Sequence, residues 1–278
     1  MKRIFQTFWT KPMDDNKLQK NVYIAALSVQ YAKASGYYVV MYTDTLGYSY
    51  LKDLGYDEIN TYLDNIPEDV NPSQFFAYPK FFAGLKEEIG SIHIDFDVFL
   101  KKPCVDKFFN DKSIDIILQC EEGYARFYRD YVYGREQILN HEYPETLKVN
   151  HLDSSNVGVV GFNNQELKDL YYSWYFDYID FYKNRLSYLQ GVASEMFSEQ
   201  VNIDYLMKTG KYNCFYLLPK DSGRNNEIVN KCADDIGYQH LQGSNKYRRV
   251  IIDKVLQVLG NKFPDTLKLV KKLFNEDN

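Results

Sequence analysis

Two acidic residues that follow a short apolar run are the first candidates for chemistry in this sequence. The segment Ile92–Leu100 reads Ile-His-Ile-Asp-Phe-Asp-Val-Phe-Leu and carries carboxylates at Asp95 and Asp97. On a strand, side chains two positions apart lie on the same face, so both carboxylates can approach one ion or ligand. Adjacent carboxylates repel each other unless a cation lies between them. The spacing indicates a divalent-cation site, and the alternative is a pair of exposed acids at a strand end.

A second polar group lies near the end of the chain, in the run His240-Leu-Gln-Gly243-Ser-Asn-Lys246. Imidazole is a ligand for ions of the Mn²⁺ class and complements two carboxylates. Gly243 lets the backbone approach a phosphate closely, and Lys246 supplies a compact positive charge. A lone histidine is more often structural, as we expect for His93. Together with the two aspartates, however, the run predicts a site of two carboxylates, one imidazole and one phosphate-binding lysine.

Alternating strand and helix signals are expected to position these side chains. Strands are predicted over residues 3–8, 37–42, 59–63, 91–99, 115–119, 156–162 and 212–218. Helices are predicted over residues 18–32, 48–54, 79–88, 164–185 and 197–207 and after Pro264. Such alternation favours an α/β fold with a mostly parallel sheet and helices on both faces. Ligands of open α/β sheets bind at the carboxyl ends of the strands, where the two aspartates are expected.

Length and composition exclude several classes of protein. With 278 residues and 45% hydrophobic residues, the chain is long and apolar enough for a large core. A net charge of −5 gives no support for a nucleic-acid partner. No apolar run approaches the ~20 residues of a membrane span, and residues 1–15 lack the apolar core of a signal peptide. The four cysteines show no CxxC spacing. We therefore expect a cytoplasmic protein.

The two polar motifs together resemble those of GT-A fold glycosyltransferases. The likeness is closest to the retaining enzymes of family eight and to the family thirty-two-like transferases of the capsule and mannosyl type, and it covers about residues 3–246. It implies a single GT-A-like (Rossmann-like) domain with a mostly parallel central sheet. A nucleotide-sugar-binding half is expected over residues 1–105, a small acceptor half over residues 106–246, and a basic helical tail over residues 247–278.

The resemblance also implies roles for particular residues. Asp95, Asp97 and His240 would hold Mn²⁺ or Mg²⁺ against the diphosphate of a nucleotide-sugar donor, and Lys246 would neutralise the departing diphosphate. Glu199-Gln200 is similar to the Asp-Gln pair near the anomeric carbon, with Gln200 beside the sugar and Glu199 as the nucleophile of any covalent intermediate. The residues expected to contact the donor are Thr7, Asp44, Lys80, Asp95, Asn156, Gly158, Gly243 and Lys246.

Each supporting residue has a structural alternative. Asp44 would cap the following turn, and Lys80 would be a solvated helix lysine. Asn156 and Gly158 would serve a strand edge or bulge. Glu199 and Gln200 would lie on a solvated helix face. Two features depart from family eight: Glu199 replaces an aspartate, and no Asn/Asp-x-x-Tyr element follows the first strand.

The expected function is therefore the transfer of a sugar, with retention, from a UDP-sugar to a hydroxyl of a glycan or lipid-linked saccharide, as in surface polysaccharide synthesis. One alternative is a haloacid-dehalogenase-type phosphohydrolase, in which Asp234-Asp235 would be the distal acidic pair. Another is a carbohydrate-binding protein without activity. The basic tail either packs as a terminal helix or touches the inner face of a membrane.

Overall fold

The computed structural model describes residues 1–122, 153–183, 197–210, 212–220, 222, 231 and 234–275 of the chain. These residues form two compact units. The first comprises Met1–Asn65, His93–Asp106 and Val229–Asn278, and the second comprises Ile66–Ile92 and Lys107–Ile228. Both units combine separate stretches of sequence. The single domain with halves over residues 1–105 and 106–246 and a tail over residues 247–278 stays a prediction.

Strands of the central sheet in the first unit follow the order β3, β2, β1, β4. They cover Glu58–Asn60, Tyr38–Thr43, Arg3–Phe8 and Ile92–Ile94, respectively, and β4 enters this unit at His93. β1 pairs with β2 and β2 with β3 in parallel, with Thr7 opposite Tyr42. Because these strands run in one direction, the side chains that follow β1 and β2 emerge at the same edge of the sheet.

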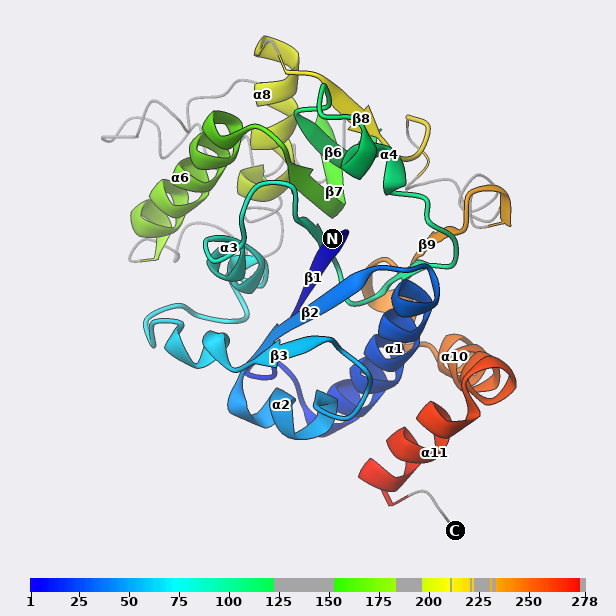
Figure 1. The fold of residues 1–278 in the computed structure, drawn as a ribbon. Helices are drawn as coiled ribbons and strands as arrows, with labels where there is room; N and C mark the ends of the chain where they lie inside the picture. Colours follow the sequence, from blue (N-terminus) through cyan, green and yellow to red (C-terminus); the bar gives the residue numbers. More distant parts are fainter. Residues whose placement is uncertain are drawn as a thin grey trace. The chain divides into compact units, whose positions relative to one another are not determined.

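Helix α1 (Asp15–Ala34) is the largest element packed in this unit. It begins where the Asp14 side chain accepts a hydrogen bond from the Lys17 N–H, and its buried residues include Val22, Ile24 and Val29. The helices α10 (Arg249–Lys262) and α11 (Pro264–Leu273) lie beside it (Figure 1). The remaining elements of the unit are α2 (Thr45–Leu51), a 3₁₀-helix η1 (Tyr62–Asn65), β5 (Val98–Leu100), β9 (Tyr238–His240) and a 3₁₀-helix η6 (Gly243–Tyr247).

Aromatic side chains fasten the basic tail to α1. The ring of Phe274 lies 5.6 Å from that of Tyr23, and the ring of Phe263 lies 5.6 Å from that of Tyr31. The tail therefore packs against the unit as terminal helices, and a contact with a membrane stays a prediction. No helix among the described residues is both long and apolar enough to cross a membrane.

The second unit contains the other three strands of the central sheet, in the order β7 (Ser154–Phe162), β6 (Ile116–Glu122), β8 (Cys214–Tyr216). β6 pairs with β7 antiparallel and with β8 parallel. The helices among its described residues include α3 (Tyr78–Gly84), α6 (Gln165–Tyr182), a π-helix η4 (Phe197–Val201) and α8 (Asn202–Thr209). Helix α4 (Asp106–Asn110) is where the chain passes from the first unit to the second.

Stacked aromatic rings join α3 to α6 in the core of this unit. Phe81 stacks on Tyr175 with ring centroids 3.5 Å apart, and Tyr171 lies 5.1 Å from Phe81. These three side chains are almost completely buried, so the many tyrosines of this chain contribute directly to the core.

The predicted fold class is confirmed, because the seven strands of the central sheet are mostly parallel and helices flank them (Figure 1). Several predicted boundaries are wrong. The helix over residues 48–54 runs from Thr45 to Leu51, because the Asp44 side chain caps it, and the strand over residues 212–218 is limited to Cys214–Tyr216. The expected strand over residues 91–99 ends at Ile94, because the Asp95 carbonyl accepts a hydrogen bond from the Val98 N–H and closes a turn. The strand over residues 59–63 ends at Asn60, whose side chain accepts from the Tyr62 N–H. The helix over residues 79–88 ends at Gly84.

Gly161 in β7 tests how tightly the second unit is packed. A Cβ at this position would lie 2.9 Å from the Ser91 carbonyl oxygen and 2.9 Å from Ile92 Cγ1. We expect Gly161→Ala to lower the free energy of unfolding by about 1–3 kcal/mol, because a backbone neighbour cannot move aside as a flexible side chain would. Urea denaturation measures this change, with the exposed Ser173→Ala as a control within about 0.5 kcal/mol of the unchanged protein. Equal midpoints for both variants would show that β7 can shift without cost.

Candidate metal centre

The turn between β4 and β5 carries both candidate aspartates. Its backbone is held by two further hydrogen bonds, from the Gln6 side-chain amide to the Asp95 carbonyl (3.4 Å) and from the Leu241 N–H to the Asp97 carbonyl (3.0 Å). The turn therefore has a fixed place between the first strand and the chain's C-terminal part.

His240 reaches this turn through a small second sheet. β5 and β9 pair antiparallel, with Val98 directly opposite His240. Because Val98 follows Asp97 in the chain, this register places the imidazole beside the second carboxylate. The pairing thus brings together residues from the middle and the end of the sequence.

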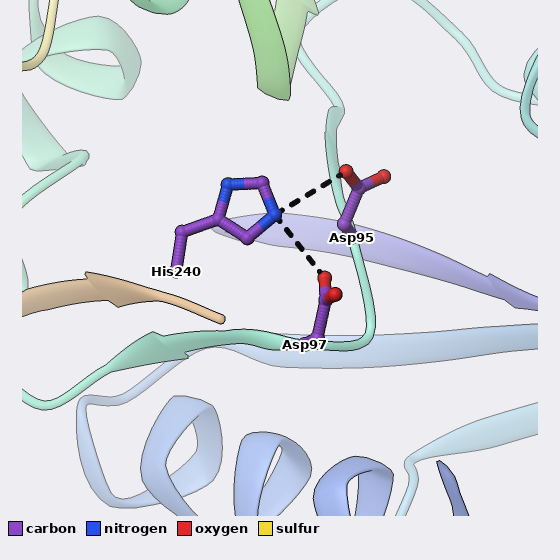
Figure 2. Close-up of side chains that lie close together, drawn as sticks. All are labelled: Asp95, Asp97 and His240. Atoms are coloured by element: carbon purple, nitrogen blue, oxygen red, sulfur yellow. Dashed lines mark ion pairs between the residues drawn. The ribbon is translucent and has the colours of Figure 1, made fainter. Parts of the chain in front are cut away.

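The three side chains converge on one point, as Figure 2 shows. His240 Nε2 lies 3.3 Å from Asp97 Oδ1 and 3.8 Å from Asp95 Oδ2, and one ligand atom from each residue lies within 4.8 Å of the others. Neighbouring ligands of a six-coordinate ion with ~2.1 Å bonds are about 3 Å apart, so small movements would bring these atoms to coordinating positions. Two carboxylates and one imidazole form a donor set suited to Mn²⁺ or Mg²⁺.

Lys246 adds a positive charge to this cluster. Its Nζ lies 2.7 Å from Asp97 Oδ2 and 5.1 Å from the centre of the Phe96 ring. Burial alone would raise the pKa of Asp97, which is only 4% exposed, but Lys246 and His240 hold that pKa well below its usual range. Burial alone would lower the pKa of Lys246, and the Asp97 carboxylate outweighs it, so this pKa is raised. Both side chains therefore carry their charges at neutral pH.

Two polar side chains lie behind Asp95, of which Thr7 but not His93 was predicted as a site residue. Thr7 Oγ1 lies 3.3 Å from His93 Nε2, and His93 Nδ1 lies 3.8 Å from Asp95 Oδ1. His93 is buried, in line with the structural role expected for it, and its ring lies close to the Asp95 carboxylate. The only sign in the sequence that His93 lies near the site is its position two residues before Asp95. Thr7, expected at the nucleotide, lies beside His93.

Hydrogen bonds give Asp44 a structural role, whereas the space beside Gly243 is open. The Asp44 carboxylate accepts hydrogen bonds from the Gly47 N–H (2.8 Å) and from both the N–H and the hydroxyl of Thr10 (2.8 and 2.7 Å). It therefore caps α2, as its structural alternative states, and its contact with a nucleotide stays a prediction. Gly243 is exposed and has a φ of +64°, and a Cβ at this position would meet no atom within 4 Å.

Lys80 and Glu199 form a buried ion pair in the second unit. Lys80 Nζ donates to Glu199 Oε1 at 2.6 Å and to the Val157 carbonyl oxygen at 3.1 Å. Their exposed fractions are 7% and 4%, so the alternatives that placed both side chains in solvent are wrong. The Tyr171 hydroxyl donates to the Glu199 carbonyl oxygen at 2.6 Å and holds the backbone of the same residue.

The remaining candidates of the second unit lie on irregular backbone. Gln200 is half-buried on the π-helix η4, a conformation that is frequent at functional sites. The Asn156 side chain accepts from the Gly158 N–H (3.0 Å) and donates to Glu122 (3.2 Å), next to a register shift between β6 and β7. This geometry agrees with the bulge alternative for Asn156 and Gly158.

The predicted site residues therefore form two groups, one in each unit. The first unit brings together Asp95, Asp97, His240 and Lys246. The second unit holds Lys80, Asn156, Gly158, Glu199 and Gln200.

Comparisons with known proteins agree with the architecture. A family model described as a family of unknown function, DUF6734, matches residues 1–273. No curated protein sequence matches the chain. The glycosyltransferase GlyE of Streptococcus pneumoniae TIGR4 has a similar structure, with a TM-score of 0.51 and 10% sequence identity over 99% of this chain and 63% of that chain. At this identity the likeness shows a shared fold, the GT-A type expected from the motifs.

Two further solved structures are more distant. The galactosyltransferase LgtC, in complex with donor and acceptor sugar analogs, gives a TM-score of 0.47 and 10% identity over 93% of this chain and 95% of that chain. Mouse xyloside xylosyltransferase 1 gives a TM-score of 0.42 and 12% identity over 78% of this chain and 84% of that chain.

Removing the imidazole tests the metal centre directly. We expect His240→Ala to weaken Mn²⁺ binding at least about tenfold, because one of three ligands is lost while the fold is kept. The electron paramagnetic resonance signal of free Mn²⁺ in a titration measures this affinity. The matched control is Asp234→Asn, which removes an exposed acid of the same unit. Equal Mn²⁺ affinities for His240→Ala and the unchanged protein would contradict the assignment.

Breaking the buried ion pair tests the second unit. We expect Lys80→Met to lower the free energy of unfolding by about 3–5 kcal/mol, because it leaves the Glu199 carboxylate buried without its counter-ion. The double variant Lys80→Met/Glu199→Leu should recover most of this loss, since neither charge then remains. Chemical denaturation of the three proteins provides the measurement. A double variant no more stable than Lys80→Met would show that the charges are not coupled.

Proposed function

The chain belongs to the family of unknown function DUF6734, and we propose that it is a metal-dependent glycosyltransferase that moves a sugar from a nucleotide-diphosphate donor to a hydroxyl group. The observation that carries this proposal is the convergence of Asp95, Asp97, His240 and Lys246 in the first unit. Two carboxylates and an imidazole fit a divalent ion, and the adjacent ammonium fits an anionic ligand of that ion. The fold shared with GlyE supports the same proposal.

The positive charges of the site suit the cleavage of a bond to a diphosphate, because negative charge builds up on the leaving group. A bound Mn²⁺ or Mg²⁺ would supply Lewis-acid stabilisation of the negative charge on the leaving diphosphate. Lys246 supplies a second positive charge on the chain itself, and Gly243 in the same 3₁₀-helix leaves room for a phosphate to approach its backbone. Behind the ligand set, His93 Nδ1 lies 3.8 Å from Asp95 Oδ1, and Thr7 Oγ1 lies 3.3 Å from His93 Nε2.

The second unit supplies candidates for the sugar. Glu199 Oε1 is held by Lys80, and the Tyr171 hydroxyl holds its backbone, so the side chain is fixed in the core. Gln200, which is next in the chain and half-buried, is therefore the better candidate for the group beside the sugar ring. We propose that Gln200 supports the positive charge that develops at the anomeric carbon, with retention of configuration, and that Glu199 positions it.

The resemblance of the motifs favours UDP as the nucleotide of the donor, and a glycan or a lipid-linked saccharide as the acceptor. Asp44, Lys80, Asn156 and Gly158 remain candidates for donor contact beside the structural roles described above. A peripheral membrane contact of the C-terminal tail and a cytoplasmic location also stay predictions.

Donor turnover tests the proposal. With Mn²⁺ present, we expect the protein to release UDP from at least one of a panel of UDP-sugars, and to do so faster with a saccharide acceptor. Asp97→Ala and His240→Ala should each lower the rate at least about 100-fold, because the charge on the leaving group is no longer neutralised. Asp234→Asn is again the control expected to keep the rate.

Unchanged turnover in both variants would reject the assignment of the site. Turnover of a phosphomonoester with a trapped aspartyl-phosphate would instead support the phosphohydrolase. Glycan affinity measured by calorimetry, without binding of any sugar nucleotide, would support the binding protein.

A further inference from the structure

We propose that Lys246 changes partner when the donor binds, pairing with Asp97 in the free protein and with the diphosphate in the complex. The proposal rests on the function proposed above and adds a property of this chain's own lysine. Its consequence is that the divalent ion binds weakly alone and tightly together with a diphosphate.

The geometry of Asp97 is the starting point. One of its carboxylate oxygens, Oδ2, lies 2.7 Å from Lys246 Nζ, and the other, Oδ1, lies 3.3 Å from His240 Nε2. The ammonium therefore neutralises the same carboxylate that the ion would use. With a side chain only 6% exposed, Asp97 has little water to screen this interaction.

An ammonium in this position weakens binding of a divalent ion by itself. An ion held by Asp97 Oδ1 and His240 would lie a few ångströms from Lys246, and like charges at this range in a partly buried site repel strongly. The ion also has to compete with Lys246 for the Asp97 carboxylate, because Lys246 already forms an ion pair with it. The ammonium of Lys246 thus lowers the affinity of the site for a divalent ion.

The surroundings of Lys246 allow it to leave Asp97. It lies on the short 3₁₀-helix η6, in which Gly243, Ser244 and Asn245 are exposed. Its Nζ lies 5.1 Å from the centre of the Phe96 ring and 5.5 Å from that of the Tyr247 ring, and the faces of both rings attract a cation. The four-carbon stem of lysine lets the ammonium move without a change of fold.

A diphosphate would offset the repulsion between Lys246 and the divalent ion. Its negative charges would attract Lys246 away from Asp97 and would also attract the ion, so that each positive charge would have a negatively charged partner. Coupling of this kind is reciprocal, and the diphosphate must raise the affinity of the ion by the same factor by which the ion raises that of the diphosphate. We expect Lys246 to contribute a measurable part of this factor.

The variant Lys246→Met separates this role from simple phosphate binding, because it keeps a long unbranched side chain and removes the charge. Titrations with Mn²⁺ alone, followed by the paramagnetic resonance of the free ion, should show affinity at least about fivefold higher than in the unchanged protein. Because UDP also binds Mn²⁺ in solution, the coupling is measured on the protein: by calorimetry, adding Mn²⁺ should raise the UDP affinity of the variant by a smaller factor than that of the unchanged protein. No turnover is needed for either measurement.

Two controls accompany this variant. Lys246→Arg keeps the charge and should keep the weak binding of Mn²⁺ alone. Lys254→Met removes an exposed lysine of the same unit and should leave the affinity unchanged, which excludes an effect of net charge. Lys246→Ala provides a second uncharged variant, and thermal unfolding shows that each protein is folded.

Mn²⁺ affinity that is unchanged or lower in both uncharged variants would overturn the proposal, since a lysine that only contacts phosphate has no effect on the ion alone. Failure of the proposed function has a different signature, because Mn²⁺ would then fail to raise UDP affinity in the unchanged protein as well. A rise in Mn²⁺ affinity in Lys246→Met with a reduced effect of Mn²⁺ on UDP affinity supports the change of partner.

Discussion

The antiparallel pairing of β5 with β9 is the constraint on which the candidate site depends. It places His240 opposite Val98, and so places an imidazole beside a carboxylate that is almost completely buried. A buried carboxylate is costly unless cations and hydrogen bonds compensate it, and Asp97 obtains both from the C-terminal segment that β9 brings to it. The fold and the charge of the site are therefore linked, because separating the two strands would leave Asp97 without its partners.

The second unit also contains buried charges that compensate each other. Lys80 on α3 and Glu199 on the π-helix η4 are both buried and hydrogen-bonded, and Lys80 also donates to the backbone of β7. An uncompensated charge in this place would destabilise the unit, so the pair fixes α3, β7 and η4 relative to one another. The irregular backbone of η4 is thereby held in one conformation, which is what a residue such as Gln200 needs to be placed accurately.

The sequence predicts the elements well where the signal is local. The strand over residues 3–8 and the helix that contains residues 18–32 follow from residue types and spacing close together in the sequence, and the predicted fold class is confirmed. Features set by distant pairing were not predictable in this way. The apolar run around Asp95 looks like one strand, but the backbone turns there because Val98–Leu100 pairs with β9 instead of continuing β4. The burial of Lys80 likewise depends on a partner far along the chain, and a lysine on a short helix carries no local sign of it.

This turn gives the two aspartates different environments, although their spacing on a strand would have made them equivalent. The side chain of Asp97 is 6% exposed and is bound by Lys246 and His240, whereas that of Asp95 is 31% exposed and lies near His93. A ligand that enters from solvent therefore meets Asp95 first, while Asp97 is already compensated by the protein. Because an ion must draw on both carboxylates, its affinity depends on how readily Asp97 is released from its internal partner. The turn thus makes the charge of Lys246, rather than the number of carboxylates, the property that limits binding of the ion.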